Sequence, residues 1–395
     1  MEPRARRLLA TWIGAAGCAP SVVIAVYTLA GPAILATFDL TYDRMGLLMS
    51  AGMVGYGVSA LVGGVLLDLI AVRTLARGAL VLAAAACVGG SLAPVWGLLG
   101  AATVILGAAG GLLTVLPIVL FADLYPEDRT RTMTRWQLVL SLATVALPLV
   151  LGVLLAKAAG RFGDDRGWRV LIMGCAPLFV GLLLLVPGSA LGRRAAGASP
   201  RLGDLAEVAR RPMVLSVIVI GALHVAADTA AYSWIVLMAK ERFGSGPGTA
   251  GVLIAGYALA YALGRLVRGA VRWPWRPLPT VAVGSLVGSV VLVLAVRAPS
   301  LPAVIGTYAA AGVFLSLNWP SLLGYAGERF ADRAGTVIGA INAATAPSTV
   351  LVSVLVGVVS RLAGAVSVGM LVPAALFLTL SLVAAAADLR SRRLD

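Results

Sequence analysis

Twelve long apolar runs, each separated from the next by a shorter polar segment, dominate the chain. Each run has about 20 residues or more, the length that an α-helix needs to cross a hydrocarbon core of about 30 Å. The runs lack the alternation of apolar and polar residues that is typical of membrane β-barrel strands. Only helices and closed barrels satisfy their backbone groups in lipid, so the pattern predicts membrane-spanning helices. The predicted spans are 10–36, 45–70, 78–97, 99–122, 134–157, 168–187, 213–239, 249–271, 279–297, 302–326, 334–360 and 364–387.

The third and fourth runs are nearly continuous, because only Pro94–Gly97 separates them. Eleven spans are therefore the alternative count. The distribution of positive charge favours twelve, since most of the 31 lysine and arginine residues lie in alternate connecting segments, as the positive-inside rule requires. The sequence thus predicts a multi-pass protein of the cell membrane with both termini in the cytoplasm. Eleven spans would place the C-terminal arginines outside.

Composition excludes several other classes of protein. The chain is 60% hydrophobic and 12% charged, whereas soluble domains have about 45–50% apolar and about 25% charged residues. The net charge of +14 lies in clusters between the apolar runs, so we expect no nucleic-acid partner. His224 is the single histidine, and Cys18, Cys87 and Cys175 each fall within an apolar run. We find no nucleotide-binding or catalytic motif, and we expect neither a metal nor another cofactor.

The chain divides into two matched halves. The polar segment 189–212 separates six spans in residues 1–188 from six in residues 213–395, and we interpret it as a cytoplasmic linker. Leu61–Arg77 between spans two and three resembles Ala262–Arg276 between spans eight and nine, because both have glycine near a helix end followed by spaced arginines. Such internal repeats are typical of secondary transporters.

These features resemble the major facilitator superfamily. Its loop between spans two and three carries a glycine, an aspartate and basic residues, and Gly64, Asp68 and Arg73 occupy matching positions here. The chain departs from that motif at 69, 71 and 72. The sequence Gly167–Arg169 at the start of span six is another frequent feature of the superfamily. The resemblance implies an all-α membrane fold of twelve helices, arranged as two pseudo-symmetric six-helix bundles around a central cavity, in a monomeric transporter.

Asp228 is the main candidate for transport chemistry. It lies near the middle of span seven, whereas nearly all other charged residues lie at span ends. A charge at that depth costs about 2.5–3.5 kcal/mol on insertion scales and usually faces a cavity or a partner. His224 and Tyr232 lie four residues before and after it, on the same helix face. We expect Asp228 and His224 to bind substrate or couple transport to protons. The alternative is a structural hydrogen bond between helices.

The resemblance implies further candidates. Spans one, four, seven and ten line the cavity of the superfamily, and the corresponding candidates are Tyr27, Thr114, Asn318 and Trp319. Pro320 follows Trp319 and can break the helix there. Gly64, Asp68, Arg73 and Arg265 lie at inner span ends and are candidates for a cytoplasmic gate, with simple membrane anchoring as the alternative.

The sequence therefore predicts a secondary active transporter that moves a small organic solute across a lipid bilayer by alternating access. Proton coupling is a hypothesis, and uncoupled facilitation is its alternative. An exporter of drugs or natural products is a second alternative. Against it, the region around Pro148 lacks paired glycines and span four lacks an arginine, both of which are usual in drug–proton antiporters. A membrane-embedded enzyme or sensor is a remote alternative.

Overall fold

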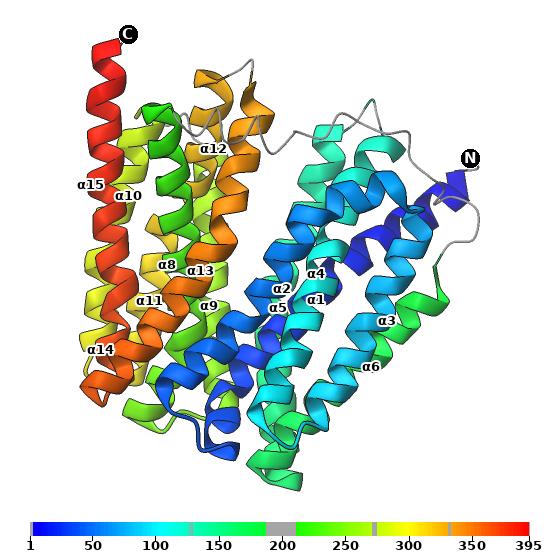
Figure 1. Ribbon diagram of the computed structural model, residues 1–395. Coiled ribbons are helices and arrows are strands. Elements are labelled where there is room, and N and C mark those ends of the chain that lie inside the picture. The colour runs from blue at the N-terminus through cyan, green and yellow to red at the C-terminus, as the bar shows by residue number, and fades with distance from the viewer. Residues whose placement is uncertain are drawn as a thin grey trace. The chain divides into compact units, whose positions relative to one another are not determined.

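The computed structural model describes residues 3–125, 127, 129–186, 211–270, 275–330 and 333–394, and all regular structure in these ranges is helical (Figure 1). Eleven stretches of the described residues are long and apolar enough to cross a membrane, and α2 is a further helix of 28 residues. This confirms the predicted all-α membrane fold. The predicted linker lies outside the described residues over 187–210.

The first compact unit comprises Met1–Leu40 and Ala51–Ser199. Its helices are α1 (Pro3–Thr37), most of α2 (Tyr42–Leu69), α3 (Val72–Ser91), α4 (Trp96–Leu124), α5 (Arg129–Phe162) and α6 (Asp164–Leu184). The third and fourth runs are separate helices, and the chain turns between them at 92–95. The reading that fuses these two runs into one span is therefore wrong.

Glycines bring α2 and α4 into backbone contact. A Cβ atom at Gly107 would lie 1.9 Å from the carbonyl oxygen of Gly52, and one at Gly55 would lie 1.9 Å from that of Val104. At Gly111 the same atom would collide with the Ser59 hydroxyl group. Only residues without a side chain permit such a close approach of two helices.

The second compact unit comprises Thr41–Ser50 and Pro200–Asp395. Its helices are the first turns of α2 with α8 (Pro212–Phe243), α9 (Pro247–Ala270), α10 (Pro277–Arg297), α11 (Leu301–Leu315), α12 (Asn318–Arg329), α13 (Ala334–Ala363), α14 (Val366–Gly369) and α15 (Leu371–Leu394). The start of α2 packs on α13, where a Cβ atom at Gly46 would lie 2.7 Å from the carbonyl oxygen of Ser353. Asp43 and Arg361 form an ion pair of 3.5 Å beside this contact.

Two predicted spans are interrupted helices. The run 302–326 is divided into α11 and α12 by a turn at Ser316 and Leu317. Pro320 explains this interruption, because a proline has no N–H group to bond the carbonyl oxygen four residues earlier, which here belongs to Ser316. The run 364–387 is divided into α14 and α15 at Met370. A continuous helix over either range is therefore a wrong expectation.

Candidate functional site

Helix α8 carries the polar face that the sequence singles out. Pro212 stands at its first turn, where a missing N–H group costs nothing, and Gly244 ends it in the left-handed conformation (φ 62°). Between these ends, His224, Asp228 and Tyr232 follow one another at intervals of four residues, so they lie along one side of the helix. Asp228 is the only acidic residue of α8 before its last turn.

Helix α9 supplies the partners of this face. Tyr257 and Tyr261 are also four residues apart, and α9 runs antiparallel to α8 along the cluster, as the order of the contacts shows. The hydroxyl group of Tyr257 donates a hydrogen bond to Oδ1 of Asp228. One turn away, the hydroxyl group of Tyr261 lies 3.4 Å from Nε2 of His224. Asp228 and His224 thus each meet a tyrosine of α9, and no described hydrogen bond joins Asp228 to His224.

A third tyrosine fixes the position of Tyr257. The rings of Tyr257 and Tyr308 of α11 stack with their centroids 4.4 Å apart and their planes 18° apart. Gly312, one turn after Tyr308, permits this contact, since a Cβ atom there would lie 3.0 Å from both the ring and the carbonyl oxygen of Tyr257. We call His224, Asp228, Tyr257, Tyr261 and Tyr308 the acid–tyrosine cluster.

His224 is enclosed by aromatic rings. Its imidazole ring stacks on Trp319 at 6.2 Å and lies 6.0 Å from the ring of Phe377 on α15. The residue is 3% exposed, and its Nδ1 atom has no hydrogen-bond partner among the described residues. A buried ring nitrogen without a partner is unusual and requires an explanation, such as a ligand or a proton that arrives in another state. The structure therefore brings two of the predicted residues, His224 and Trp319, together.

Arg265 belongs to the same region. Its guanidinium carbon lies 4.6 Å from the centroid of the Tyr261 ring, which is the geometry of a cation–π contact. It extends the series Tyr257, Tyr261, Arg265 along one side of α9. The sequence interpretation assigned Arg265 to a cytoplasmic gate, whereas the structure places it one helical turn from the partner of His224.

The other predicted cavity residues have contacts of a different kind within their own units. Asn318 donates from its amide nitrogen to the Ser285 hydroxyl group on α10, at 3.0 Å, so its side chain is directed towards that helix and away from the cluster.

In the first unit, Thr114 donates to the carbonyl oxygen of Gly111 in its own helix. The hydroxyl group of Tyr27 is buried beside Gly90 of α3. Tyr232 is partly exposed one turn beyond Asp228.

The predicted gate between α2 and α3 stays a prediction. The side chain of Asp68 lies outside the described residues, and Gly64 has no described surroundings. Arg73 is partly buried near the start of α3. Its contact with Asp68 is therefore untested.

The cluster can exchange a proton but offers no evident metal site. Among the described residues, no group of three histidine, cysteine, aspartate or glutamate side chains could hold a metal ion. A carboxylate that accepts a hydrogen bond from one tyrosine keeps lone pairs to accept a proton or a donor group of a ligand. Protonation would remove the only acidic charge from the middle of α8, and this change is large in a medium of low dielectric constant.

Sequence reasoning missed Tyr257, Tyr261 and Tyr308. A signal for the first two was present, because Tyr257, Tyr261 and Arg265 repeat the four-residue spacing of His224, Asp228 and Tyr232 in the next span. Two antiparallel helices with polar residues at the same spacing can form several pairs of side-chain contacts, one at each turn. Tyr308 gave no comparable signal, since it stands alone in an apolar run.

Residues 12–352 match the model of the Major Facilitator Superfamily. The chain is 26% identical, over 295 residues, to the uncharacterised MFS-type transporter YtbD of Bacillus subtilis (strain 168), and the match covers 72% of each chain. Among solved structures, it resembles a bacterial homologue of the human lysosomal transporter Spinster in an inward-facing, occupied conformation, with a TM-score of 0.76 and 15% identity over 99% of this chain and 98% of that one.

A structure of a proton-dependent oligopeptide transporter is also similar, with a TM-score of 0.73 and 15% identity over 99% of this chain and all of the other. At this level of identity the solved structures show a shared fold. The family match covers most of the sequence, and the helices of both units agree with it. The chain therefore belongs to the Major Facilitator Superfamily, whose members are membrane transporters and not enzymes.

Proposed function

We propose that the protein is a secondary active transporter that moves a small organic solute by alternating access, with the acid–tyrosine cluster as its coupling element. The observation that carries this proposal is the hydrogen bond between Tyr257 and Asp228 in the middle of two long apolar helices. An ionisable group at that depth is costly, so its presence favours a role in a pathway for solute or protons.

Protons are the coupling ion that this cluster suits best. Sites for hard cations such as Ca²⁺ need about six or more oxygen ligands, commonly with several carboxylates, whereas Asp228 is the only carboxylate described in the cluster. Tyr257 can donate to the charged carboxylate, and a protonated Asp228 could instead donate to the hydroxyl oxygen of Tyr257. The hydrogen bond can thus persist with its direction reversed, while the charge of Asp228 disappears. Such a change biases an equilibrium between two transporter conformations.

Uptake into proteoliposomes tests the proposal. A thermal-shift screen of the purified protein against pentoses, hexoses, dipeptides, amino acids and lipophilic amines selects the solute, whose uptake is then measured with and without an imposed pH gradient. We expect the gradient to drive accumulation in the native protein. Asp228→Asn keeps the size of the side chain but cannot titrate, and should lower gradient-driven accumulation about a hundredfold, as for loss of a proton-transfer group.

The matched control is Asp165→Asn, which changes the same residue type at the exposed start of α6. It should leave accumulation unchanged. Accumulation by Asp228→Asn within twofold of the native value would exclude this carboxyl group as the coupling element. Uptake that never exceeds equilibration, with or without the gradient, would identify an uncoupled facilitator.

We also infer that both termini lie in the cytoplasm, which the distribution of arginine supports. A reporter that fluoresces only in the cytoplasm, fused after Asp395, should be bright. A reporter active only outside the cytoplasm should be inactive at the same position. The opposite pattern would reverse the orientation.

A further inference from the structure

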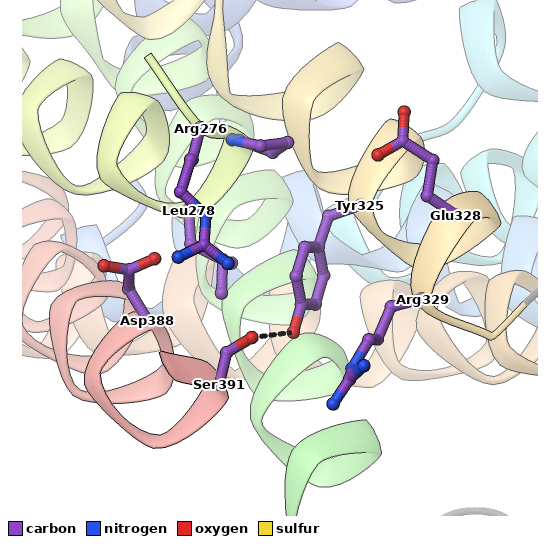
Figure 2. A pocket seen from close by; sticks show the side chains of 8 residues that line it. Arg276, Leu278, Tyr325, Glu328, Arg329, Asp388 and Ser391 are labelled. Carbon is purple, nitrogen blue, oxygen red and sulfur yellow. Dashed lines mark hydrogen bonds between the residues drawn. The ribbon is translucent and has the colours of Figure 1, made fainter. Parts of the chain in front are cut away.

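A hollow of about 220 Å³ lies in the second unit, where α10 begins and where α12 and α15 end. Figure 2 shows the side chains that line it, among them Arg276, Tyr325, Glu328, Arg329, Asp388 and Ser391. It shares no residue with the acid–tyrosine cluster. Sites for whole drug-sized ligands measure about 300–1,000 Å³, so this hollow suits a smaller group.

The hollow has a buried polar floor and a charged rim. Asp388, Ser391 and Tyr325 are 6%, 2% and 8% exposed, whereas Arg276, Glu328 and Arg329 are exposed. In the floor, the Tyr325 hydroxyl group donates to Oγ of Ser391 at 3.3 Å, which leaves the Ser391 hydroxyl group its own hydrogen to donate. Asp388 accepts a hydrogen bond of 2.7 Å from Nε of Arg392.

The two rim arginines flank the floor. Figure 2 shows the side chains of Arg276 and Arg329 on opposite sides of the Tyr325 ring, with the hydrogen bond to Ser391 between them. An anion above this hydrogen bond could meet both guanidinium groups and the Ser391 hydroxyl group. Guanidinium groups match the oxygens of a phosphate in geometry as well as in charge. The carboxylates of Glu328 and Asp388 line the same hollow and would attract a cation.

The hollow lies at the end of an exposed apolar surface of the second unit. On α15, Leu378, Leu382 and Leu389 are 44%, 65% and 61% exposed and follow one side of the helix, and Leu389 is the neighbour of Asp388. On α10, which packs along α15, Val290 and Leu294 are more than half exposed. Trp275, the neighbour of Arg276, is 49% exposed, and tryptophan is enriched at membrane–water interfaces. Acyl chains on these helices would bring a headgroup to the hollow.

We propose that this hollow binds the headgroup of one phosphatidylethanolamine molecule. The phosphodiester anion lies between Arg276 and Arg329 and accepts from the Ser391 hydroxyl group, while the primary ammonium group donates to Glu328 or Asp388. A headgroup with only negative charge would face two carboxylates. A quaternary ammonium group, as in phosphatidylcholine, has no N–H group to donate to them. The lining therefore selects a phosphate that carries a primary ammonium.

Native mass spectrometry of the full-length protein tests this proposal. Detergent-purified protein is mixed with equal amounts of dioleoyl phosphatidylethanolamine, phosphatidylcholine and phosphatidylglycerol. One phosphatidylethanolamine molecule should be retained about tenfold more than either competitor, as expected for one hydrogen bond between charged groups. Water-soluble O-phosphoethanolamine carries the same chemistry without acyl chains and should displace the lipid only at a concentration at least a hundredfold higher.

Two variants separate the two halves of the headgroup. Arg329→Gln removes a phosphate contact and should weaken retention of phosphatidylethanolamine and phosphatidylcholine alike. Glu328→Gln removes one of the two carboxylate charges that attract the ammonium group and should reduce the preference between these two lipids, while leaving retention of phosphatidylcholine unchanged. Arg390→Gln is the matched control, because it removes an exposed arginine at the end of α15 that does not line the hollow. It should change neither retention nor preference.

Several results would overturn the proposal. They are equal retention of phosphatidylethanolamine and phosphatidylcholine, a preference for phosphatidylglycerol, and an equal effect of Arg390→Gln and Arg329→Gln. Displacement by O-phosphoethanolamine at the concentration of the lipid would identify a soluble ligand instead. Size-exclusion profiles and thermal unfolding in phosphatidylcholine confirm that each variant is folded, so that loss of retention reports on the hollow alone.

Discussion

The two units differ in what their closest helix contacts bring together. In the first, the closest approaches join backbone to backbone, as at Gly107 and Gly52 between α4 and α2. In the second, a glycine of α11 makes room for a side chain, Tyr257, which holds the carboxylate of Asp228. Helices α1 and α4 carry no charged residue between Arg7 and Asp39 or between Trp96 and Asp123, whereas α8 carries Asp228 near its middle.

The second unit also contains backbone contacts at glycine, as at Gly46 and Ser353, so the difference lies in the ionisable pair that it adds. A backbone contact between glycines has one good geometry and tolerates little change. A carboxylate with a tyrosine partner can change its charge while its neighbours stay in place. We therefore expect substitutions at packing contacts to act on folding and substitutions at the acid–tyrosine cluster to act on transport, and four predictions test this expectation.

The largest effect on folding should come from Gly107→Ala. The added Cβ atom would lie 1.9 Å from the carbonyl oxygen of Gly52, so α2 and α4 must separate. We expect a loss of about 2–3 kcal/mol in the free energy of unfolding, as for an overpacked core. Chemical unfolding of the purified protein in detergent measures it.

The control is Gly89→Ala, because no atom lies within 4 Å of a Cβ atom at this exposed position of α3. It should be neutral or slightly stabilising, since alanine favours a helix over glycine by about 1 kcal/mol. Equal losses in the two variants would contradict a specific contact between α2 and α4.

The next effect should be on transport. Tyr257→Phe removes the donor to Asp228 while the stack on Tyr308 remains. A hydrogen bond to a charged group is worth about 1.5–3 kcal/mol, so gradient-driven uptake should fall about tenfold or more. Tyr27→Phe is the matched change in the first unit and should leave uptake within about twofold, because no described hydrogen bond joins the Tyr27 hydroxyl group to a carboxylate. The opposite ranking would move the transport chemistry to the first unit.

Asn318→Ala should affect folding although it lies in the second unit. The substitution removes the hydrogen bond to Ser285 and leaves a small void in the contact between α12 and α10. We expect a loss of about 1–2 kcal/mol in the free energy of unfolding. Uptake per folded molecule should be unchanged. A large fall in uptake at native stability would instead make Asn318 a transport residue, as the sequence interpretation held.

The smallest effect should come from Asp43→Asn at the start of α2. A hydrogen bond from the Thr41 side chain, with a longer-range contribution from Arg361, lowers the pKa of Asp43. A lowered pKa means that the charged form stabilises the folded state above the ordinary aspartate pKa of about 3.9. This contribution is lost as the pH falls through the lowered pKa.

Exposed ion pairs contribute about 0.2–1 kcal/mol, so the variant should be less stable by such an amount at pH 7 and pH 5. The difference should shrink below about pH 4. Unfolding at pH 7, 5 and 3 measures it. A difference that grows on acidification would show that Asp43 is stabilised in its protonated form.

The sequence predicted the helices well because the length and apolar character of a membrane span are local properties. The candidate role of Asp228 was equally evident, since an acidic residue within an apolar run can be recognised from the sequence alone. Its partner was not predictable in the same way. The pairing of Tyr257 with Asp228 depends on the rotation of α9 about its axis, and the apolar pattern of a membrane helix specifies that rotation only weakly.

The placement of Asn318 and Trp319 shows a second limit. Both were assigned to one surface of a continuous span, yet they follow the interruption at Ser316 and Leu317. As consecutive residues of α12 the two side chains project in different directions, so that Trp319 meets His224 while Asn318 meets Ser285. A proline in the sequence indicates that a helix can break, but it does not fix the geometry of the two pieces.

The interruption between α11 and α12 also has a mechanical consequence. The bending stiffness of a helix comes largely from its ladder of hydrogen bonds, and Pro320 removes one rung at Ser316. The joint can therefore flex without breaking a bond that already exists. Tyr308 lies on one side of it and Trp319 on the other. We therefore expect α12, which carries the Trp319 ring that stacks on His224, to change its angle to α11 while the stack of Tyr257 on Tyr308 stays in place.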